Sequence, residues 1–512
     1  MKVLTATQSR QLDAYTIKAE GIESIDLMER AAQALTAEIR RLWSGLLNFY
    51  VFAGSGNNGG DALAVARLLA AEGHRVEVFL FNVNGKLSKD CETNRDRLVE
   101  GAASSRVVFH EITKNFEMPE LSESDIVIDG LFGSGLNKPI NGGLAALVKL
   151  INRSAAKVVS IDLPSGLMCE DNSYNIPAHI IRADVTLTIQ TLKPSFLMAD
   201  NQEYLGEVRV VNIGLKEDEI TFTENPYTLD ELSEMASLLR GRSPFGNKGT
   251  FGHGLLIAGS YGMAGAAVLA ARACMKSGIG KLTIHTPKVN NSILQISVPE
   301  VVLHHDEDNY FFSTPVKTDP YNAVAIGPGL GTKNCSAVAF AEQMSHTTVP
   351  LILDADALNI LGGHRGWLPQ IPSNAILTPH PKEFMRLFGE CLTNFDQLHQ
   401  AREQAIHQQI YIILKGHYTA ICTPQGHTYF NSTGNSGMAT AGTGDALTGI
   451  LLSLLSQGYS IENACRLGVY IHGLAGDLAA EELTEEGTTV NDLIDYIPYA
   501  IKKLKRHASS NC

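Results

Sequence analysis

The stretch Val51-Phe-Ala-Gly54-Ser-Gly56-Asn57-Asn58-Gly59-Gly60-Asp61 decides the fold of the first part of the chain. An apolar run that begins at Phe49 ends here in a glycine-rich polar turn, and residues 62–71 then read as a helix. A strand that passes through glycines into a helix is the repeating unit of a doubly wound α/β sheet. The free N–H groups at the helix end favour polar or anionic ligands. The stretch therefore predicts a parallel sheet with a ligand site at a strand end.

Strand and helix patterns alternate on both sides of this turn, and the first 50 residues have a helical spacing of apolar side chains. A charged, Gly- and Pro-rich stretch between about residues 215 and 250 interrupts the alternation, which then begins again. We expect an α/β protein of two domains, 1–222 and 223–512, each a three-layer αβα arrangement. The expected strands are 49–53, 75–81, 125–128, 157–161, 185–188, 254–258, 281–286, 323–326, 350–353, 375–377 and 411–414, with early helices over 60–72 and 143–152.

The composition excludes several classes of protein. With 44% apolar and 19% charged residues the chain is globular, and its net charge of -13 argues against binding to nucleic acid. No apolar run approaches the roughly 20 residues that cross a membrane. The first residues contain no apolar signal segment, and none of the eight cysteines forms a CxxC pair. We therefore expect a cytoplasmic protein without structural disulfides or membrane contact.

Two more predicted strands end in polar turns, Asp129-Gly-Leu-Phe-Gly-Ser-Gly-Leu-Asn-Lys-Pro139 and Asp162-Leu-Pro-Ser-Gly-Leu167. Any one aspartate there is most simply a turn residue or a helix cap. Parallel strands, however, bring their carboxyl ends to one edge of the sheet, so the three turns converge, and their oxygens suit a hard cation. The first turn also fits the GxGxxG pattern of dehydrogenases, but no acidic residue ends the next strand, where that interpretation requires one.

The three stretches, in this order, resemble the YjeF N-terminal domain, the NAD(P)H-hydrate epimerase, over about residues 8–215. The resemblance implies a Rossmann-like fold, a catalytic Asp162 and a potassium ion (K+) held by Asn58, Asp129 and Ser165. Some relatives are binding modules; because Asn58, Asp61 and Asp162 are all present here, we favour an active epimerase. The residues implied to bind the substrate are Asn57, Asn58, Gly59, Gly60, Asp61, Gly133, Ser134, Gly135, Leu136, Asn137, Lys138, Pro139 and Asp162.

The second half contains six glycine-rich or polar motifs: GSYGMAGAA (259–267), GPGLG (327–331), DADALN (354–359), LTPHPKE (377–383), KGHYT (415–419) and GTGD (442–445). The last, Gly442-Thr-Gly-Asp445, is the most informative because an apolar helical run, 447–455, follows it. Glycines at a helix N-terminus offer an anion hole for a phosphoryl group, and Asp445 is placed to accept the proton of a hydroxyl. The simpler alternative is that Asp445 caps the helix. Lys415 either approaches a nucleotide phosphate or is an ordinary surface lysine. No Walker A sequence is present, which argues against a P-loop NTPase.

The six motifs together resemble the YjeF C-terminal domain, the ribokinase-like NAD(P)H-hydrate dehydratase, over about residues 228–500. The resemblance implies a ribokinase-like fold, a catalytic Asp445 and the use of ADP or ATP with Mg2+. The hydrate is implied to contact Ala266, Gly329, His380 and Asp445, and the adenine nucleotide to contact Lys415, Gly416, His417, Tyr418, Thr419 and Gly444.

The two resemblances imply one chemistry. Water added to the nicotinamide ring of NADH or NADPH gives two epimers of the hydrate, NADHX or NADPHX. The second domain would dehydrate the S form at the expense of ADP or ATP, and the first would interconvert R and S. The family also implies a homo-oligomer. The main rival is a ribokinase-like vitamin-precursor kinase fused to a non-catalytic binding module, and a dehydrogenase ranks last.

Overall fold

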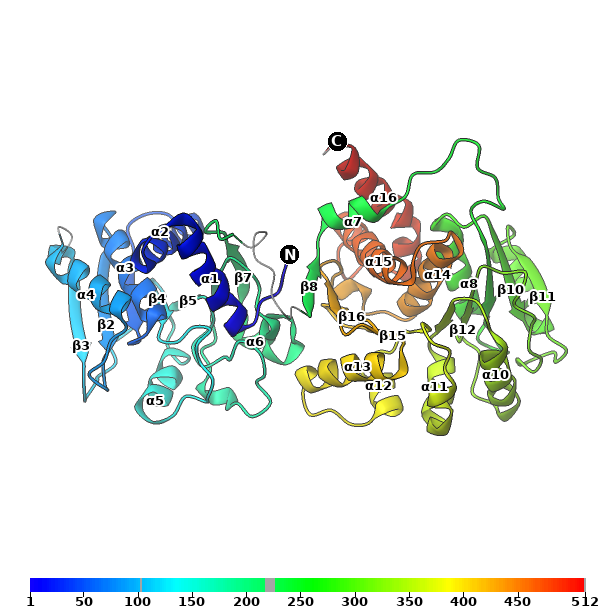
Figure 1. Cartoon of the computed structure of the whole chain (residues 1–512), viewed down its shortest axis with the longest axis horizontal. Coiled ribbons are helices and arrows are strands. Elements are labelled where there is room, and N and C mark those ends of the chain that lie inside the picture. Colours follow the sequence, from blue (N-terminus) through cyan, green and yellow to red (C-terminus); the bar gives the residue numbers. More distant parts are fainter. Residues whose placement is uncertain (102–103, 217–225, 511–512) are drawn as a thin grey trace. The chain divides into compact units, whose positions relative to one another are not determined.

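The computed structural model describes residues 1–101, 104–216 and 226–510, which form two compact units. The N-terminal unit consists of Lys2–Asn225 with Thr393–Phe395, and the C-terminal unit of Met1, Pro226–Leu392 and Asp396–Cys512. The domain boundary expected between residues 222 and 223 lies outside the described residues. Each unit is a sheet with helices on both faces, which confirms the predicted α/β class (Figure 1).

The N-terminal unit contains a seven-stranded sheet in the order β3-β2-β1-β4-β5-β6-β7, with every neighbouring pair parallel. The order reverses between β1 and β4, so that the chain leaves these two strands in opposite directions. The strands are β1 (Asn48–Ala53), β2 (Arg75–Phe81), β3 (Val107–Ile112), β4 (Asp125–Gly130), β5 (Lys157–Ile161), β6 (Val185–Ile189) and β7 (Glu207–Val211).

Both faces of this sheet are buried, and alternate strand residues serve the two faces. Val51, Val78 and Ile128 pack with the helices α1 to α4, whereas Phe52 and Val127 pack with α5 on the opposite face. Burial on both sides explains why the strands are nearly continuous apolar runs. The helices are α1 (Ala6–Glu20), α2 (Ser24–Leu42), α3 (Asn57–Ala71), α4 (Lys89–Glu100), α5 (Gly142–Ile151) and α6 (Gln202–Leu205).

The C-terminal unit contains a ten-stranded sheet in the order β11-β10-β9-β12-β13-β14-β15-β16-β17-β8. It is parallel except where β16 pairs with β15 and with β17, and its order reverses between β9 and β12. The strands are β8 (Tyr227–Asp230), β9 (His253–Ile257), β10 (Lys281–Thr286), β11 (Val302–His305), β12 (Ala323–Ile326), β13 (Leu351–Leu353), β14 (Ile376–Leu377), β15 (Tyr411–Leu414), β16 (Ala420–Cys422) and β17 (Thr428–Asn431).

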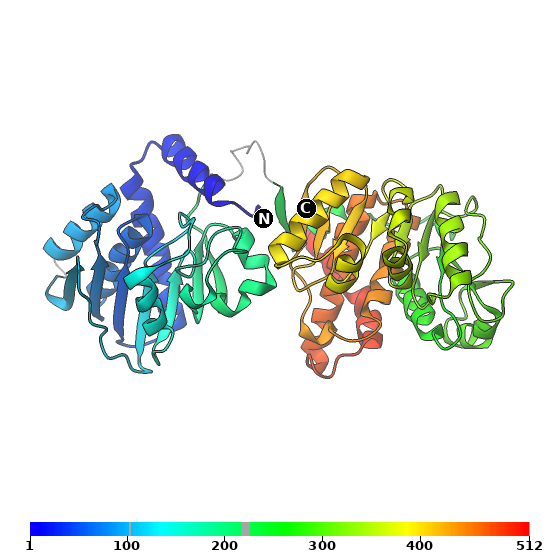
Figure 2. The same ribbon diagram turned by 90° about the horizontal axis from the view of Figure 1, so that it is seen from below.

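Two groups of helices cover this second sheet. Both views place α12 and α13 on the face opposite to α15 and α16 (Figures 1 and 2). On the latter face α14 packs very closely on α8: a Cβ at Gly449 would lie 2.0 Å from the carbonyl oxygen of Ala270. The helices are α7 (Leu232–Leu238), α8 (Ala264–Lys276), α9 (Asn291–Ser297), α10 (Asn334–His346), α11 (Asp356–Gly363), α12 (Pro381–Phe388), α13 (Asn394–Gln408), α14 (Thr443–Ser456), α15 (Ile461–Leu483) and α16 (Val490–Ser510).

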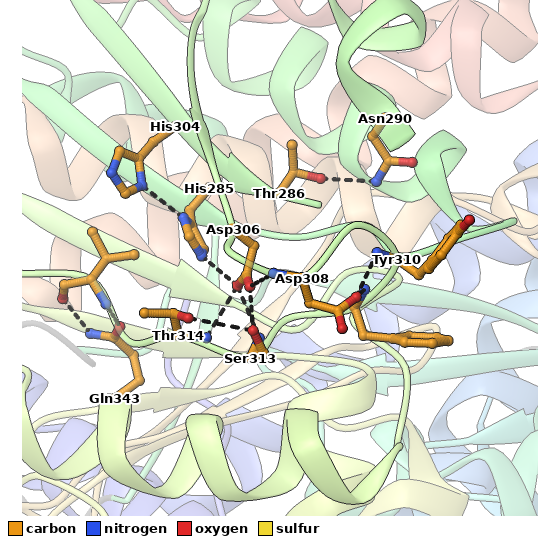
Figure 3. Close-up of polar contacts among 12 residues, drawn as sticks. His285, Thr286, Asn290, His304, Asp306, Asp308, Tyr310, Ser313, Thr314 and Gln343 are labelled. Atoms are coloured by element: carbon orange, nitrogen blue, oxygen red, sulfur yellow. Dashed lines mark hydrogen bonds and ion pairs between the residues drawn. The ribbon is translucent and has the colours of Figure 1, made fainter. Parts of the chain in front are cut away.

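A buried carboxylate, Asp306, fixes the segment that follows β11 (Figure 3). Its oxygens accept hydrogen bonds from the Nε2 atom of His285 at 2.9 Å and from the backbone N–H and hydroxyl groups of Ser313. The carbonyl oxygen of Tyr310, within this segment, accepts a hydrogen bond of 2.9 Å from the N–H of Tyr261. Asp306 therefore supports the turn 259–263 that follows β9.

We predict that Asp306→Asn destabilises the C-terminal unit by about 1–3 kcal/mol at pH 7, because the ionised carboxylate holds several donors. Burial alone would raise the pKa of Asp306, but the hydrogen bonds from His285 and Ser313 hold it below its ordinary value. The carboxylate therefore contributes stability above the pKa of about 4 in the unfolded chain, and this contribution is lost as the pH falls below it. Denaturant unfolding of both proteins between pH 7 and pH 3 measures the effect. A difference that does not shrink in acid would contradict it.

Candidate active sites

The N-terminal unit has a cavity of about 670 Å³ at the carboxyl ends of its strands. The turn after β1 and the loop after β4, which flank the reversal of strand order, line it together with residues that follow β5 and β6. Three of the predicted substrate residues, Gly59, Gly60 and Pro139, do not line the cavity. The two glycines pack closely instead: a Cβ at Gly59 would lie 1.8 Å from the carbonyl oxygen of Gly54. The predicted substrate residues that do line it are Asn57, Asn58, Asp61, Gly133, Ser134, Gly135, Leu136, Asn137, Lys138 and Asp162.

Asp162 leaves β5 with a φ of 65°, a left-handed conformation that is uncommon outside glycine. Its Oδ1 atom lies 3.0 Å from the Nζ atom of Lys193, and its Oδ2 atom accepts a hydrogen bond of 3.4 Å from the N–H of Ser134. Lys193 is almost completely buried and also donates to the carbonyl oxygens of Ile189 and Thr191, each at 3.0 Å. A buried ion pair thus holds the Asp162 carboxylate at the cavity. Sequence reasoning missed Lys193, which follows a fourth strand, β6.

Two more carboxylates line the same cavity, Asp13 on α1 and Asp61 on α3. Burial, together with the smaller effect of the Asp162 charge, raises the pKa of Asp13 to about 6, against the opposing charge of Lys193. Burial also raises the pKa of Asp61 well above its ordinary value, and the charges of Asp162 and Asp13 act in the same direction. Sequence reasoning missed Asp13, since it occupies an ordinary polar position of a helix.

The three predicted K+ ligands lie around the loop that follows β4. Asp129 is buried and accepts hydrogen bonds of 2.8 Å from the Ser160 hydroxyl and from the N–H of Ser165. The Ser165 hydroxyl donates to the carbonyl oxygen of Phe132 at 3.1 Å. The Nδ2 atom of Asn58 is buried and has no hydrogen-bond partner among the described residues. Rotating that amide would place an oxygen in the same position. The oxygen atoms of these three residues then form a set of ligands that fits a monovalent cation.

In the C-terminal unit, one buried carboxylate connects the ends of three neighbouring strands. Asp354 follows β13 and accepts hydrogen bonds from the Thr378 hydroxyl after β14 at 2.7 Å and from the Lys415 Nζ atom after β15 at 3.2 Å. Its second oxygen accepts a hydrogen bond of 2.8 Å from the hydroxyl of Thr448 on α14. Asp354 therefore fixes Lys415 beside the start of α14. The sequence places Asp354 in one of the six motifs but assigns it no role.

The start of α14 brings three predicted site residues together. Gly442, with a φ of 94°, occupies the cap position, so Asp445 is the third helical residue rather than the cap. A Cβ at Gly444 would lie 3.4 Å from the Nζ atom of Lys415. Burial, with smaller effects from the charges of Asp354 and Asp356, raises the pKa of Asp445 to about 7, and Lys415 acts in the opposite direction. A carboxyl group that ionises near neutral pH thus stands beside a cation at a helix N-terminus.

The other predicted residues of this unit belong to neighbouring strand ends. Gly329 has a φ of 60°, and a Cβ there would lie 3.0 Å from the Cβ atom of Ala266, so these two residues are adjacent. His380 caps α12, with its Nδ1 atom accepting the N–H groups of residues 382 and 383, and burial lowers its pKa. The turn 415–419 joins β15 to β16, and a hydrogen bond of 2.9 Å from the Thr419 hydroxyl to the carbonyl oxygen of Gly416 closes it.

Over residues 1–101, 104–216 and 226–510, no three His, Cys, Asp or Glu side chains are grouped so as to hold a metal ion. Within the same ranges no helix combines the length and the apolar character that crossing a membrane requires.

The sequence matches two family descriptions, one in each unit: "YjeF-related protein N-terminus" over residues 24–195 and "NAD(P)H-hydrate dehydratase" over residues 254–499. A relative from Thermofilum pendens, named bifunctional NAD(P)H-hydrate repair enzyme Nnr, is 34% identical and aligns over 100% of this chain and 98% of its own length. The Escherichia coli protein of the same name is 29% identical over 92% of this chain and 88% of its own length.

Solved structures resemble the C-terminal unit. A ribokinase-like superfamily protein from Enterococcus faecalis is 26% identical with a TM-score of 0.50, and covers 56% of this chain and 99% of its own. An ADP/ATP-dependent NAD(P)H-hydrate dehydratase from Bacillus subtilis is 32% identical with a TM-score of 0.48, and covers 54% of this chain and 97% of its own. Because the two family matches occur in one chain, and a relative of that name is 34% identical over 100% of this chain, this chain belongs to the family of bifunctional NAD(P)H-hydrate repair enzymes.

Proposed function

We propose that this protein repairs hydrated nicotinamide nucleotides, with an epimerase in the N-terminal unit and a nucleotide-dependent dehydratase in the C-terminal unit. The observation that carries the proposal is the placement of Asp445, Gly444 and Lys415 together in a chain whose other unit holds a separate cavity with Asp162. Incubating the S hydrate with ADP and Mg2+ tests it: reduced cofactor, AMP and phosphate are expected. A stable phosphorylated product would favour the rival kinase.

The dehydratase chemistry follows from the difficulty of expelling a hydroxyl group. The C6 hydroxyl attacks the terminal phosphorus of the nucleotide, AMP leaves when ADP is used, and the hydroxyl becomes a phosphate ester. The ring-nitrogen lone pair then expels phosphate, and loss of the C5 proton restores the double bond. Asp445 would accept the hydroxyl proton, the turn 442–444 would hold the phosphoryl oxygens, and Lys415 would face the nucleotide phosphates.

The nucleotide is expected to bring Mg2+, which neutralises charge on its phosphate oxygens. The charges around Lys415 fit an added cation, because Asp354, Asp356 and Asp445 are carboxylates around a single lysine. Asp354 is already held by three side chains. Each oxygen of Asp356 accepts a single hydrogen bond, one from the N–H of Gly331 and one from the Asn359 amide, so Asp356 is the carboxylate that we assign to the metal.

We predict that Asp445→Asn lowers the dehydratase kcat about 10²–10⁴-fold, the usual contribution of a general base, with little change in nucleotide affinity. A general base must be ionised to accept a proton, and the pKa of Asp445 is about 7. The wild-type kcat should therefore rise through neutral pH, and Asp445→Asn should lack this rise. The absorbance of the reduced nicotinamide follows both. Near-normal turnover in Asp445→Asn would show that the carboxylate is not the base.

We predict that Asp162→Asn abolishes interconversion of the R and S hydrates and leaves dehydration of the S hydrate close to wild type. The physical reason is that Asp162 lines the cavity of one unit and the dehydratase residues belong to the other. Chromatography of the epimers measures the first activity and absorbance the second. Loss of both activities in parallel would indicate misfolding and contradict separate sites.

We infer that Asn58, Asp129 and Ser165 hold K+ and that the ion orders the loop after β4. We predict that KCl raises the melting temperature of the N-terminal unit by about 3–6 °C over tetramethylammonium chloride at equal ionic strength. The reason is that an ion at about ten times its Kd stabilises the folded state by about 1.4 kcal/mol. Asn58→Ala removes a ligand and should abolish the difference. An equal response to KCl in wild type and in Asn58→Ala would exclude this site.

A further inference from the structure

Charged groups of both signs line the N-terminal cavity. Three carboxylates, Asp13, Asp61 and Asp162, face it together with the buried Lys193 and with two further cations, Arg10 and the exposed Lys138. Lys193 is paired with Asp162 at 3.0 Å, and on Asp13 its charge acts only as a smaller effect that opposes burial. Arg10, which also lines the cavity, directs its Nε atom to the carbonyl oxygen of Ala6 on its own helix. Carboxylates in so small a volume cannot all carry a charge without a large electrostatic cost.

Asp13 and Asp61 respond differently to this constraint. Asp61 lies on α3 and is buried, and this burial raises its pKa well above the ordinary value. Asp13 is half-buried, and its pKa of about 6 lets it gain and lose a proton in the range where the enzyme would work. The charged groups that act on it are Asp162, Lys193 and Asp61, and Arg10 and Lys138 also line the cavity. Asp13 is thus the cavity carboxyl suited to exchange protons.

Epimerisation at C6 requires such a group. The bond between C6 and its hydroxyl oxygen must break, and a new C–O bond must form on the other face of the ring. A proton given to the departing hydroxyl lets it leave as water, while the lone pair of the ring nitrogen forms a double bond to C6. A second water then adds to C6, the double-bond electrons return to nitrogen, and the added water loses one proton. One acid and one base complete the cycle without an oxidant or a reductant.

We propose that Asp13 and Asp162 are this acid–base pair, with protonated Asp13 releasing the hydroxyl on one face and the Asp162 carboxylate taking the proton of the water that adds. In the reverse direction the two residues exchange roles. Afterwards a proton returns from one carboxyl to the other through solvent. The inference rests on the proposed epimerase activity, and it adds Asp13 on α1 as a second catalytic residue.

The test measures interconversion of purified R and S hydrates by the full-length enzyme, corrected for the uncatalysed rate. Asp13→Asn should lower kcat about 10²–10⁴-fold in both directions with KM nearly unchanged. Asp96→Asn, an exposed aspartate on α4 outside this cavity, is the matched control and should behave as wild type. If wild type itself does not interconvert the epimers, the proposed function fails. If wild type does and Asp13→Asn is equally fast, only this inference fails.

A pH profile separates a catalytic role from a structural one. Wild-type kcat/KM should fall as the pH rises through about 6, because Asp13 then loses the proton that it donates to the departing hydroxyl. Asp13→Asn should lack this limb of the pH profile, the fall above pH 6. Should Asp13→Asn not fold, as judged by its thermal unfolding, Asp13→Glu decides. It keeps the carboxyl group, so its limb should move with the altered pKa, and a limb identical to wild type would overturn the proposal. In ¹⁸O-labelled water the new epimer should carry solvent oxygen at C6; retention of the original oxygen would also overturn it.

Discussion

Both units depend on one constraint of parallel sheets: where the strand order reverses, the loops that leave two neighbouring strands diverge. The reversal lies between β1 and β4 in the first unit and between β9 and β12 in the second. Polar groups on the two loops face a space that the backbone leaves open. Some of the glycines that the sequence predicts to bind substrate instead let the backbone pack closely beside these loops. Gly59, for example, allows the backbone of α3 to approach the turn before it.

The two sites use burial of carboxylates in different ways. In the C-terminal unit, Asp354 is fully hydrogen-bonded and positions Lys415, whereas its charge helps to raise the pKa of Asp445 to about 7. In the N-terminal unit, Lys193 is paired with Asp162, and the charge of that carboxylate helps to raise the pKa of Asp13. In each case a structurally held carboxylate tunes a second one that is free to exchange protons.

The central strands could be predicted from sequence because burial on both faces makes them continuous apolar runs. The strands β3, β7 and β11 could not, since they lie in partly exposed positions toward the sheet edges, where the apolar pattern is weak. The strands β16, β17 and β8, which extend the second sheet beyond β15, were not predicted either. The turns after β1, β4 and β5 converge on one cavity, as the sequence predicts. This could be predicted because parallel pairing alone brings the carboxyl ends of the strands to one edge of the sheet.

Residues that come to a site from elements far apart in the chain are not marked by any local sequence pattern. Asp13 belongs to the first helix, and its neighbours Asp162 and Lys193 are far along the chain. A polar residue on an amphipathic helix is most simply solvated, and nothing in its local sequence distinguishes it. Asp354 stands inside a motif, yet its function is to connect β13, β14, β15 and α14, which no local pattern encodes.

One chain joins two activities in this protein, so that both epimers of the hydrate return to the reduced cofactor. The most direct measurement adds freshly purified R hydrate to the wild-type protein with ADP and Mg2+ and follows the absorbance of reduced nicotinamide. We expect complete conversion, with one phosphate released for each cofactor formed, at a rate that exceeds uncatalysed epimerisation and rises with enzyme concentration. Formation of reduced cofactor no faster than the uncatalysed conversion of R to S would contradict it.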